Sequence, residues 1–298
     1  MKHRLSGILA ASVTPIKADY SPDLEAIPSL LYFLASRGCH GILLLGTTGE
    51  GPSFSAAERV NILRAGVQVR QAHPQVRLLA GTGTPSLAET ADLTRAAFDL
   101  GYDGVVVLPP YYYRKASDDG LFTWFKELIH QAVPADGALL GYHFPGVAGI
   151  GFSLDLLTRL KDAFPAQFAG IKDSSHDIEL ARSLGETFGE DLLVLNGTDS
   201  YLHFALENHA GGCITAPANL ISPELRQLWD RWQNGEDVAA IQEQVTHIRH
   251  VLERTPPFPP LLKALLARLH GFPHWAVRPP LEPAGEATVE ALIKELHG

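Results

Sequence analysis

The stretch FAGIKDSS (168–175) is typical of a buried β-strand, and near its end it carries a lone lysine, Lys172. An ammonium group buried at that point must either find a counter-ion or lose its proton. A neutral lysine is a nucleophile for carbonyl carbons and forms Schiff bases. One strand earlier, Tyr142 in ALLGYHFPG (138–146) supplies a phenol that can shuttle a proton. This pair predicts imine-based carbon–carbon bond chemistry in a barrel.

Seven further runs share the pattern of this strand, because each is nearly continuous in apolar residues and ends in Gly, Pro, Thr, Ser or Asp. They are GILAASVTP (7–15), GILLLG (41–46), RLLAGTG (77–83), GVVVLPP (104–110), ALLGYHFP (138–145), LLVLNGTD (192–199) and GCITAP (212–217). Buried parallel strands have this composition. Eight strands in nearly uniform units predict an α/β fold, a (β/α)8 or TIM barrel. The rival is a doubly wound open sheet, but no GxGxxG follows the first strand.

Amphipathic segments separate the strands. Apolar residues recur at helical spacing in 24–38, 55–70 and 86–101. The second and third of these begin with Ser55 and Ser86, each followed three residues later by a glutamate that can complete a capping box.

After residue 220 the pattern becomes purely helical. The candidate helices are 223–234, 236–253, 258–270 and 285–297. We therefore predict a barrel catalytic domain over 1–222, with the last barrel helix and a helical C-terminal extension over 223–298. The extension either packs on the barrel or forms an oligomerisation surface.

The composition is that of an ordinary globular protein, with 46% hydrophobic and 19% charged residues. The formal net charge of −9 argues against nucleic acid or an anionic membrane as the main partner. No run reaches the ~18 apolar residues that span a bilayer, and the N-terminus lacks a signal-peptide pattern. We expect a cytoplasmic protein.

The sequence shows no cofactor or metal motif. Its 13 histidines have neither HxH nor HExxH spacing, so we predict no metal site. Cys39 and Cys213 each lie in an apolar run and are expected to be core residues rather than a disulfide pair. An imine withdraws electrons by itself, so the predicted chemistry needs no cofactor.

Polar residues gather where the strands end, which is where barrel enzymes carry their active sites. Side chains alternate along a strand, so Tyr142 and Lys172 can both enter the barrel from adjacent strands, while Asp173 faces the helices. Two other interpretations stay open. Lys172 can be a rim lysine that extends to water, and Tyr142 can serve for packing alone.

The turn GTTGE (46–50) offers backbone amides and two hydroxyls that can bind a carboxylate, although a tight turn that needs glycine is the alternative. We favour a structural role for Glu50, because a carboxylate beside Lys172 would keep that lysine charged. At least one hydroxyl of the three tyrosines at 111–113 should face the site or a neighbouring subunit, unless all three only pack. His143 is near the chemistry, or is a half-buried structural histidine.

Five motifs occur together in the order and spacing of a known family. They are GTTGE (46–50), PPYYY (109–113), YHFPG (142–146), GIKDSS (170–175) and NGTD (196–199). From residue 7 to about residue 225, the chain resembles the dihydrodipicolinate synthase and N-acetylneuraminate lyase family of Schiff-base aldolases. Each motif alone is weak, but the combination is specific.

The resemblance implies roles for individual residues. Lys172 would form the imine with a 2-oxo acid, commonly pyruvate, and Tyr142 would shuttle the proton. Thr47 and Thr48 would hold the pyruvate carboxylate, with Thr47 also in the proton relay. Tyr112 matches a tyrosine that reaches into the neighbouring subunit's site in relatives, which implies a homo-oligomer, a dimer or a tetramer. Two more positions match the lining of the pyruvate pocket, Gly197 and Ile214.

Two departures from the family pattern bear on the substrate. Synthases that act on aspartate semialdehyde place an arginine two residues after the proline of YNxP, where it binds a second carboxylate. This chain has Val147 at that position, and His143 replaces the usual asparagine. Valine cannot make a bidentate carboxylate clamp, so a role in lysine biosynthesis is not favoured.

Other motifs resemble the archaeal-type 2-keto-3-deoxygluconate aldolases, namely GEGPSFS (49–55), PYYYR (110–114) and IKDSS (171–175). In that case Ser174, Asp199 and Ser200 are candidates to contact sugar hydroxyls.

We therefore predict a class I pyruvate-type aldolase, a lyase that cleaves or forms a 2-oxo-3-deoxy sugar acid through a Schiff base on Lys172. Its partners would be pyruvate or another 2-oxo acid, and an aldehyde. The alternatives are a 4-hydroxy-tetrahydrodipicolinate synthase-like enzyme, a dehydratase or hydratase-aldolase that uses the same imine, and a non-catalytic 2-oxo-acid-binding homologue.

Overall fold

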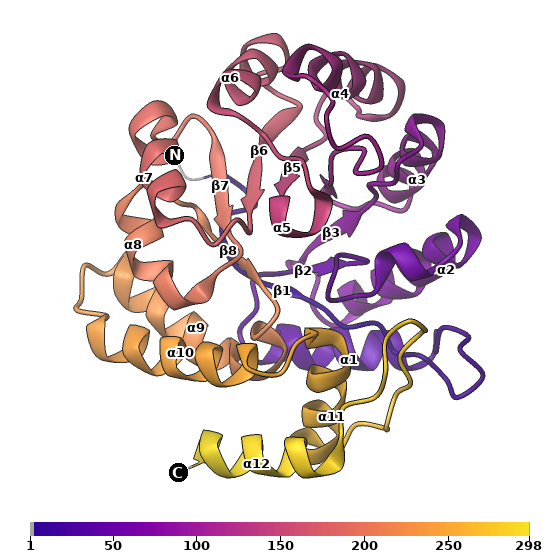
Figure 1. Ribbon diagram of the computed structural model, residues 1–298, viewed down its shortest axis with the longest axis vertical. Coiled ribbons are helices and arrows are strands. Elements are labelled where there is room, and N and C mark those ends of the chain that lie inside the picture. The colour runs from indigo at the N-terminus through magenta and orange to yellow at the C-terminus, as the bar shows by residue number, and fades with distance from the viewer. Residues whose placement is uncertain (1–2, 298) are drawn as a thin grey trace.

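The computed structural model describes residues 3–297, which contain a closed barrel of eight parallel strands in sequential order (Figure 1). The strands are β1 (Gly7–Ala11), β2 (Gly41–Leu44), β3 (Arg77–Gly81), β4 (Gly104–Val107), β5 (Leu139–His143), β6 (Phe168–Asp173), β7 (Leu193–Asn196) and β8 (Gly212–Thr215). The pairing of β8 with β1 closes the sheet. The predicted (β/α)8 barrel is confirmed.

The strands are apolar on both faces because a barrel buries both faces. One face fills the interior, where Leu43, Leu79 and Leu195 pack in the same cluster as Tyr142. The other face packs against the helices, as Ile171 does. The strands are shorter than the predicted runs, because the Gly, Thr and Pro residues that end each run belong to turns.

Helices lie between successive strands, and all of them except the short α5, which lies over the mouth of the barrel, cover its outside (Figure 1). They are α1 (Ala26–Ser36), α2 (Ala56–Gly66), α3 (Leu87–Asp99), α4 (Asp118–Ala132), α5 (Pro145–Ala148), α6 (Leu154–Ala163), α7 (Ile178–Phe188) and α8 (Leu202–Glu207). Three 3-10 turns accompany them, η1 (Gly51–Ser53), η2 (Val67–Gln71) and η3 (Asp199–Tyr201). Ser55 and Glu58 form the predicted capping box on α2, and Ser86 accepts from the amide of Glu89 at the start of α3.

More helices follow β8 and lie along one side of the barrel (Figure 1). They are α9 (Ala218–Gln233), α10 (Ala239–Glu253), α11 (Phe258–His270) and α12 (Glu286–His297). The helix α9 packs on β1, and α10 packs on η3 and α9. The domain boundary predicted between residues 222 and 223 falls inside α9, beside a kink at Ile221. Pro223 stands there without an amide proton for the helix.

A buried ion pair ties the extension to the turn that follows β2. Lys263 of α11 donates to Glu50, and both side chains are buried. Glu50 also accepts from the backbone amide of Arg278 at 2.9 Å. Its φ of 54° is a left-handed conformation that is uncommon for residues other than glycine. Glu50 therefore has the structural role favoured from the sequence, and its carboxylate anchors the extension.

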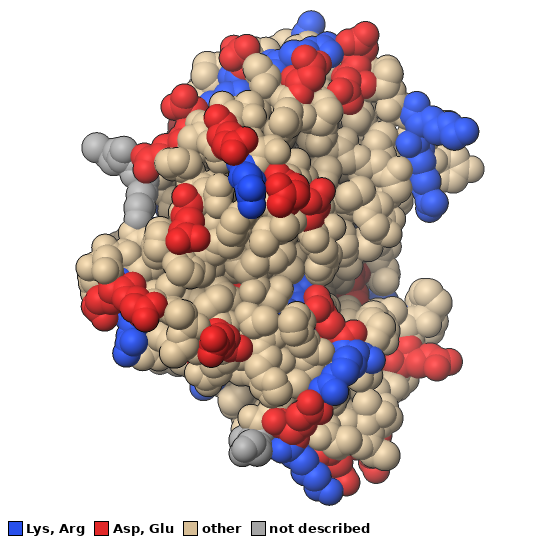
Figure 2. All heavy atoms as spheres, turned by 60° about the vertical axis from the view of Figure 1, so that its left-hand side comes forward, with Lys and Arg blue, Asp and Glu red and all other residues tan. Residues whose placement is uncertain are grey.

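Charged side chains form no large patch of one sign on the face that Figure 2 shows. Acidic and basic side chains are scattered there instead. That face offers no extended basic surface of the kind that binds nucleic acid. Among the helices of residues 3–297, none has both the length and the apolar character needed to cross a membrane.

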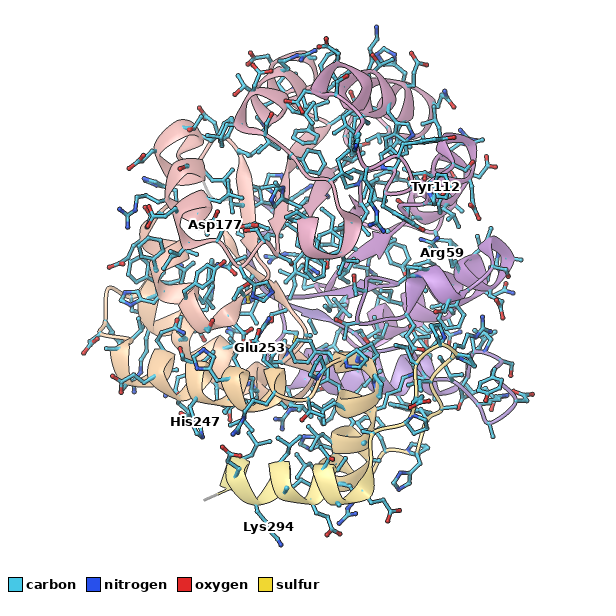
Figure 3. All side chains as sticks on the ribbon, in the orientation of Figure 1. Arg59, Tyr112, Asp177, His247, Glu253 and Lys294 are labelled. Carbon is cyan, nitrogen blue, oxygen red and sulfur yellow. The ribbon has the colours of Figure 1, made fainter. Side chains whose placement is uncertain are left out.

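Replacing Lys263 with methionine is predicted to destabilise the protein by about 3–5 kcal/mol, because it leaves Glu50 buried without a counter-charge. Urea unfolding measures this as a lower midpoint. The double variant Lys263→Met, Glu50→Gln should recover much of the loss. Lys294→Met on the exposed side of α12 (Figure 3) is the matched control and should unfold like the parent protein. Equal midpoints for Lys263→Met and Lys294→Met would contradict the assigned role of the pair.

Candidate active site

A cavity of about 300 Å³ opens at the carboxyl ends of the strands, where barrel enzymes bind their substrates. Tyr142 of β5 and Lys172 of β6 project into it from the barrel wall, and the turn after β2 supplies Thr47 and Thr48. The four residues assigned to the imine, the proton relay and the carboxylate therefore meet in one cavity.

Tyr142 and Lys172 are register partners in the parallel pairing of β5 with β6. Both side chains are buried, and Lys172 Nζ lies 4.3 Å from the centre of the Tyr142 ring. Strand alternation sends Ile171 to the opposite face, where it packs with the outer core. The barrel itself thus sets the distance between amine and phenol.

The acids that neighbour Lys172 are bound to other groups. Asp173 accepts from the amide of Ser175 at 3.0 Å, and burial raises the pKa of the Asp173 carboxyl. Asp199 forms a buried ion pair with Arg249 at 2.7 Å. Among the ion pairs of residues 3–297, none involves Lys172. Lys172 lines the cavity.

Thr47 stands next to the phenol. Its Oγ1 is 3.4 Å from the Tyr142 hydroxyl, at the long end of the hydrogen-bonding range. Catalytic hydrogen bonds are often long before substrate binds. The Thr14 hydroxyl donates to the carbonyl of Gly49 at 2.7 Å and fixes the turn that presents Thr47 and Thr48. The arrangement can relay a proton from the cavity through the phenol to the threonine.

Three more predicted residues line the cavity, namely Ser174, Gly197 and Ile214. Gly197 has no room for a side chain, since a Cβ there would lie 2.0 Å from Ser174 Oγ and 2.8 Å from the Asp173 carbonyl oxygen. Its amide donates to that same carbonyl at 2.6 Å. The close approach of the two strand ends forms this wall of the cavity.

Three predicted substrate-binding residues lie elsewhere. His143 follows Tyr142 and faces outward, where its Nδ1 accepts from the amide of Phe152 at 2.9 Å and burial lowers the pKa of the ring. Asp199 is buried against Arg249, and Ser200 lies beside it in η3. The structure does not bring these three side chains to the cavity. Alternation along β5 and the ion pair of Asp199 are the physical reasons.

Two other predicted residues lie at the surface. Tyr112, in the loop after β4, is 74% exposed and does not line this chain's cavity. Figure 3 shows it toward the outer edge of the barrel. Val147 of α5 does line the cavity and is 52% exposed, so it lies at the opening.

The C-terminal extension also contributes to the cavity, which the sequence motifs did not predict. Arg249 of α10 and Phe258 at the start of α11 line the cavity, and the guanidinium lies 5.1 Å from the centre of the Phe258 ring. Glu253 binds Arg249 Nε at 2.6 Å, from the side of α10 that faces the barrel (Figure 3). The run TPPFPP (255–260) was the only local signal, since so many prolines between two helices indicate a fixed connection.

In the part of the chain that the structure describes, no cluster of three or more His, Cys, Asp or Glu side chains is arranged to hold a metal ion. Cys39 and Cys213 are free and buried, and burial raises the pKa of both thiols. They are core residues, as predicted.

Sequence comparisons place this architecture among known enzymes. Residues 4–297 match the Dihydrodipicolinate synthetase family. An uncharacterized DapA-like lyase of Chloroflexus aurantiacus is 38% identical over 96% of this chain and 94% of the relative. A 4-hydroxy-tetrahydrodipicolinate synthase of Sorangium cellulosum is 33% identical over 98% of this chain and 95% of the relative.

A similar solved structure comes from the same family as these relatives. YagE, a prophage protein of the dihydrodipicolinic acid synthase family from E. coli K12, was determined in complex with pyruvate. It superposes with a TM-score of 0.92 at 26% identity, covering 98% of both chains. The fold is the TIM barrel of this family, and the protein is a lyase of the class I aldolase type. The chain belongs to the Dihydrodipicolinate synthetase family, so the family predicted from its motifs is confirmed.

Proposed function

We propose that Lys172 forms a Schiff base with pyruvate or a related 2-oxo acid, and that the protein joins this acid to an aldehyde or separates the two. The observation that carries the proposal is the buried pair of Lys172 and Tyr142, with Nζ 4.3 Å from the phenol ring. The similar structure in complex with pyruvate supports the choice of acid.

In the cleavage direction, the amine of Lys172 attacks C2 of a 4-hydroxy-2-oxo acid to give a carbinolamine. The carbinolamine takes up one proton from the solvent and loses water to give the iminium ion, and the final hydrolysis returns that proton. The proton of the C4 hydroxyl passes to the relay of Tyr142 and Thr47 as the C3–C4 bond breaks. The electron pair of that bond moves into the iminium group, so an enamine forms and the aldehyde leaves. The relayed proton then adds to C3, and water hydrolyses the imine to release pyruvate and Lys172.

The 2-oxo acid needs an anchor for its carboxylate. The turn of Thr47 and Thr48 offers hydroxyls and backbone amides of the kind that bind small anions. Ile214 and Gly197 line the same cavity. The anion-binding turn supports a 2-oxo acid at this end of the cavity.

Two observations bear on the chemical identity of the aldehyde partner. The named synthase relative acts in the 4-hydroxy-tetrahydrodipicolinate reaction, but Val147 offers no guanidinium to a second carboxylate. For the 2-oxo-3-deoxy sugar acid predicted from the motifs, only Ser174 of the three expected hydroxyl partners lines the cavity. We therefore propose the imine aldolase chemistry first, and treat the sugar acid as one substrate to be tested.

We also propose that Tyr112 acts in a homo-oligomer, a dimer or tetramer, by reaching the site of a neighbouring subunit. Its ring packs edge-on against Tyr113 with centroids 5.3 Å apart, and both rings are largely exposed. Exposed aromatic side chains are enriched at protein interfaces.

Borohydride reduction in the presence of pyruvate tests the imine directly. We expect the intact mass to rise by one reduced pyruvate adduct per chain, and peptide mapping to place it on Lys172. The variant Lys172→Met should lose the adduct while keeping its circular dichroism spectrum. An unmodified mass, or an adduct on a different lysine, would remove the proposed function and favour the non-catalytic binding homologue.

Tyr142→Phe tests the relay separately from the imine. The variant keeps the ring beside Lys172 but loses the oxygen that accepts the proton. We expect turnover to fall roughly 100-fold or more, the range of general acid–base catalysis, while the pyruvate adduct still forms on reduction. Turnover equal to that of the parent enzyme would show that Tyr142 only packs.

A further inference from the structure

The cavity has a reaction end and an apolar outer wall. Lys172 and Tyr142 occupy the reaction end, within the strands. Beyond the strand ends, much of the cavity lining is apolar, although His176 and Arg249 also lie there. We call the apolar side chains the outer wall, and they are Phe144, Val147, Pro257, Phe258 and Pro259. Because side chains fill the barrel interior around Tyr142, a group carried on C4 of a substrate bound to Lys172 would have to extend toward the cavity opening and this wall.

The aromatic members of the outer wall are held in place by neighbouring rings and cations. The Phe144 ring packs against Tyr142 with centroids 5.7 Å apart. The Phe258 ring lies under Arg249. A wall of packed rings is a preformed surface for an apolar group.

Arg249 brings a cation to the cavity, but its charge is already balanced. Its Nη1 donates to Asp199 at 2.7 Å, and its Nε donates to Glu253 at 2.6 Å. Arg249 is buried, so an anionic substrate would have to compete with two carboxylates in place. The guanidinium therefore shapes the wall and does not offer a site for a second substrate anion.

The remaining polar groups beyond Lys172 are few. Burial lowers the pKa of the His176 ring, which lies 3.9 Å from the Glu253 carboxylate. Ser174 contributes one hydroxyl two residues beyond Lys172, close to the reaction end. A polyhydroxylated tail would lose water from several hydroxyls and regain few hydrogen bonds, whereas an apolar tail would exchange water for ring contacts.

We propose that the aldehyde half of the substrate is uncharged and apolar, an aryl or branched alkyl aldehyde, and that Phe144, Val147 and Phe258 determine this specificity. The inference rests on the proposed imine chemistry, and it replaces the sugar acid expected from the motifs. It also gives the C-terminal extension a function, because the extension supplies one side of the wall.

Cleavage of matched 4-hydroxy-2-oxo acids tests this inference. The four substrates differ only in the group on C4, which is phenyl, isopropyl, 1,2-dihydroxyethyl or carboxymethyl. We expect kcat/KM, measured by pyruvate release, to be at least about tenfold higher for phenyl and isopropyl than for the other two, the scale at which an apolar pocket discriminates. A pyruvate adduct on reduction is measured in parallel on the same preparation.

Two variants at one exposed position sharpen the test. Val147→Arg should raise kcat/KM for the carboxymethyl substrate relative to phenyl by about tenfold, because it adds an unpaired guanidinium at the opening. Val147→Leu is the matched control and should keep the apolar preference.

The outcomes separate the two proposals. A pyruvate adduct together with equal or better cleavage of the dihydroxyethyl or carboxymethyl substrate overturns the apolar specificity and leaves the imine chemistry standing. An adduct without cleavage of either apolar substrate overturns it as well. Absence of the adduct overturns both.

Discussion

The pairing of β5 with β6 inside a closed barrel is the constraint on which the site depends. Because the two strands are in register at Tyr142 and Lys172, the amine and the phenol face the same interior on neighbouring strands. Neither side chain has to be held by a loop, and the rigid sheet fixes their separation. A slip of one residue in this pairing would turn one of the two toward the helices.

The C-terminal extension supplies one side of the cavity that opens at the carboxyl ends of the strands. Two buried ion pairs attach it to the rim, Lys263 with Glu50 and Arg249 with Asp199. Breaking such pairs is strongly destabilising, although their net contribution to stability is small. Their effect here is positional, because they bring Phe258 and its prolines over the cavity mouth. The fold and the shape of the cavity mouth are therefore coupled through residues far from Lys172 and Tyr142.

The sequence predicts the barrel and the reaction end well, because both follow from local rules. Apolar runs with polar ends mark the strands, and alternation places Tyr142 and Lys172 on one face. It predicts the outer part of the cavity poorly. Nothing in the sequence around Asp199 indicates an ion pair with Arg249, which lies fifty residues further on. A residue expected to bind substrate therefore lies in a buried ion pair outside the cavity. The packing of α10 against η3 brings Arg249 to Asp199, and the local sequence pattern around Asp199 does not reveal this long-range contact.

The most direct measurement of the central claim is a crystal structure of the protein soaked with pyruvate. The account predicts continuous electron density from Lys172 Nζ to C2 of pyruvate, with the carboxylate on the turn of Thr47 and Thr48 and the Tyr142 hydroxyl beside the new bond. Pyruvate bound elsewhere in the barrel, or held in the cavity with no bond to Lys172 under conditions that permit turnover, would contradict it.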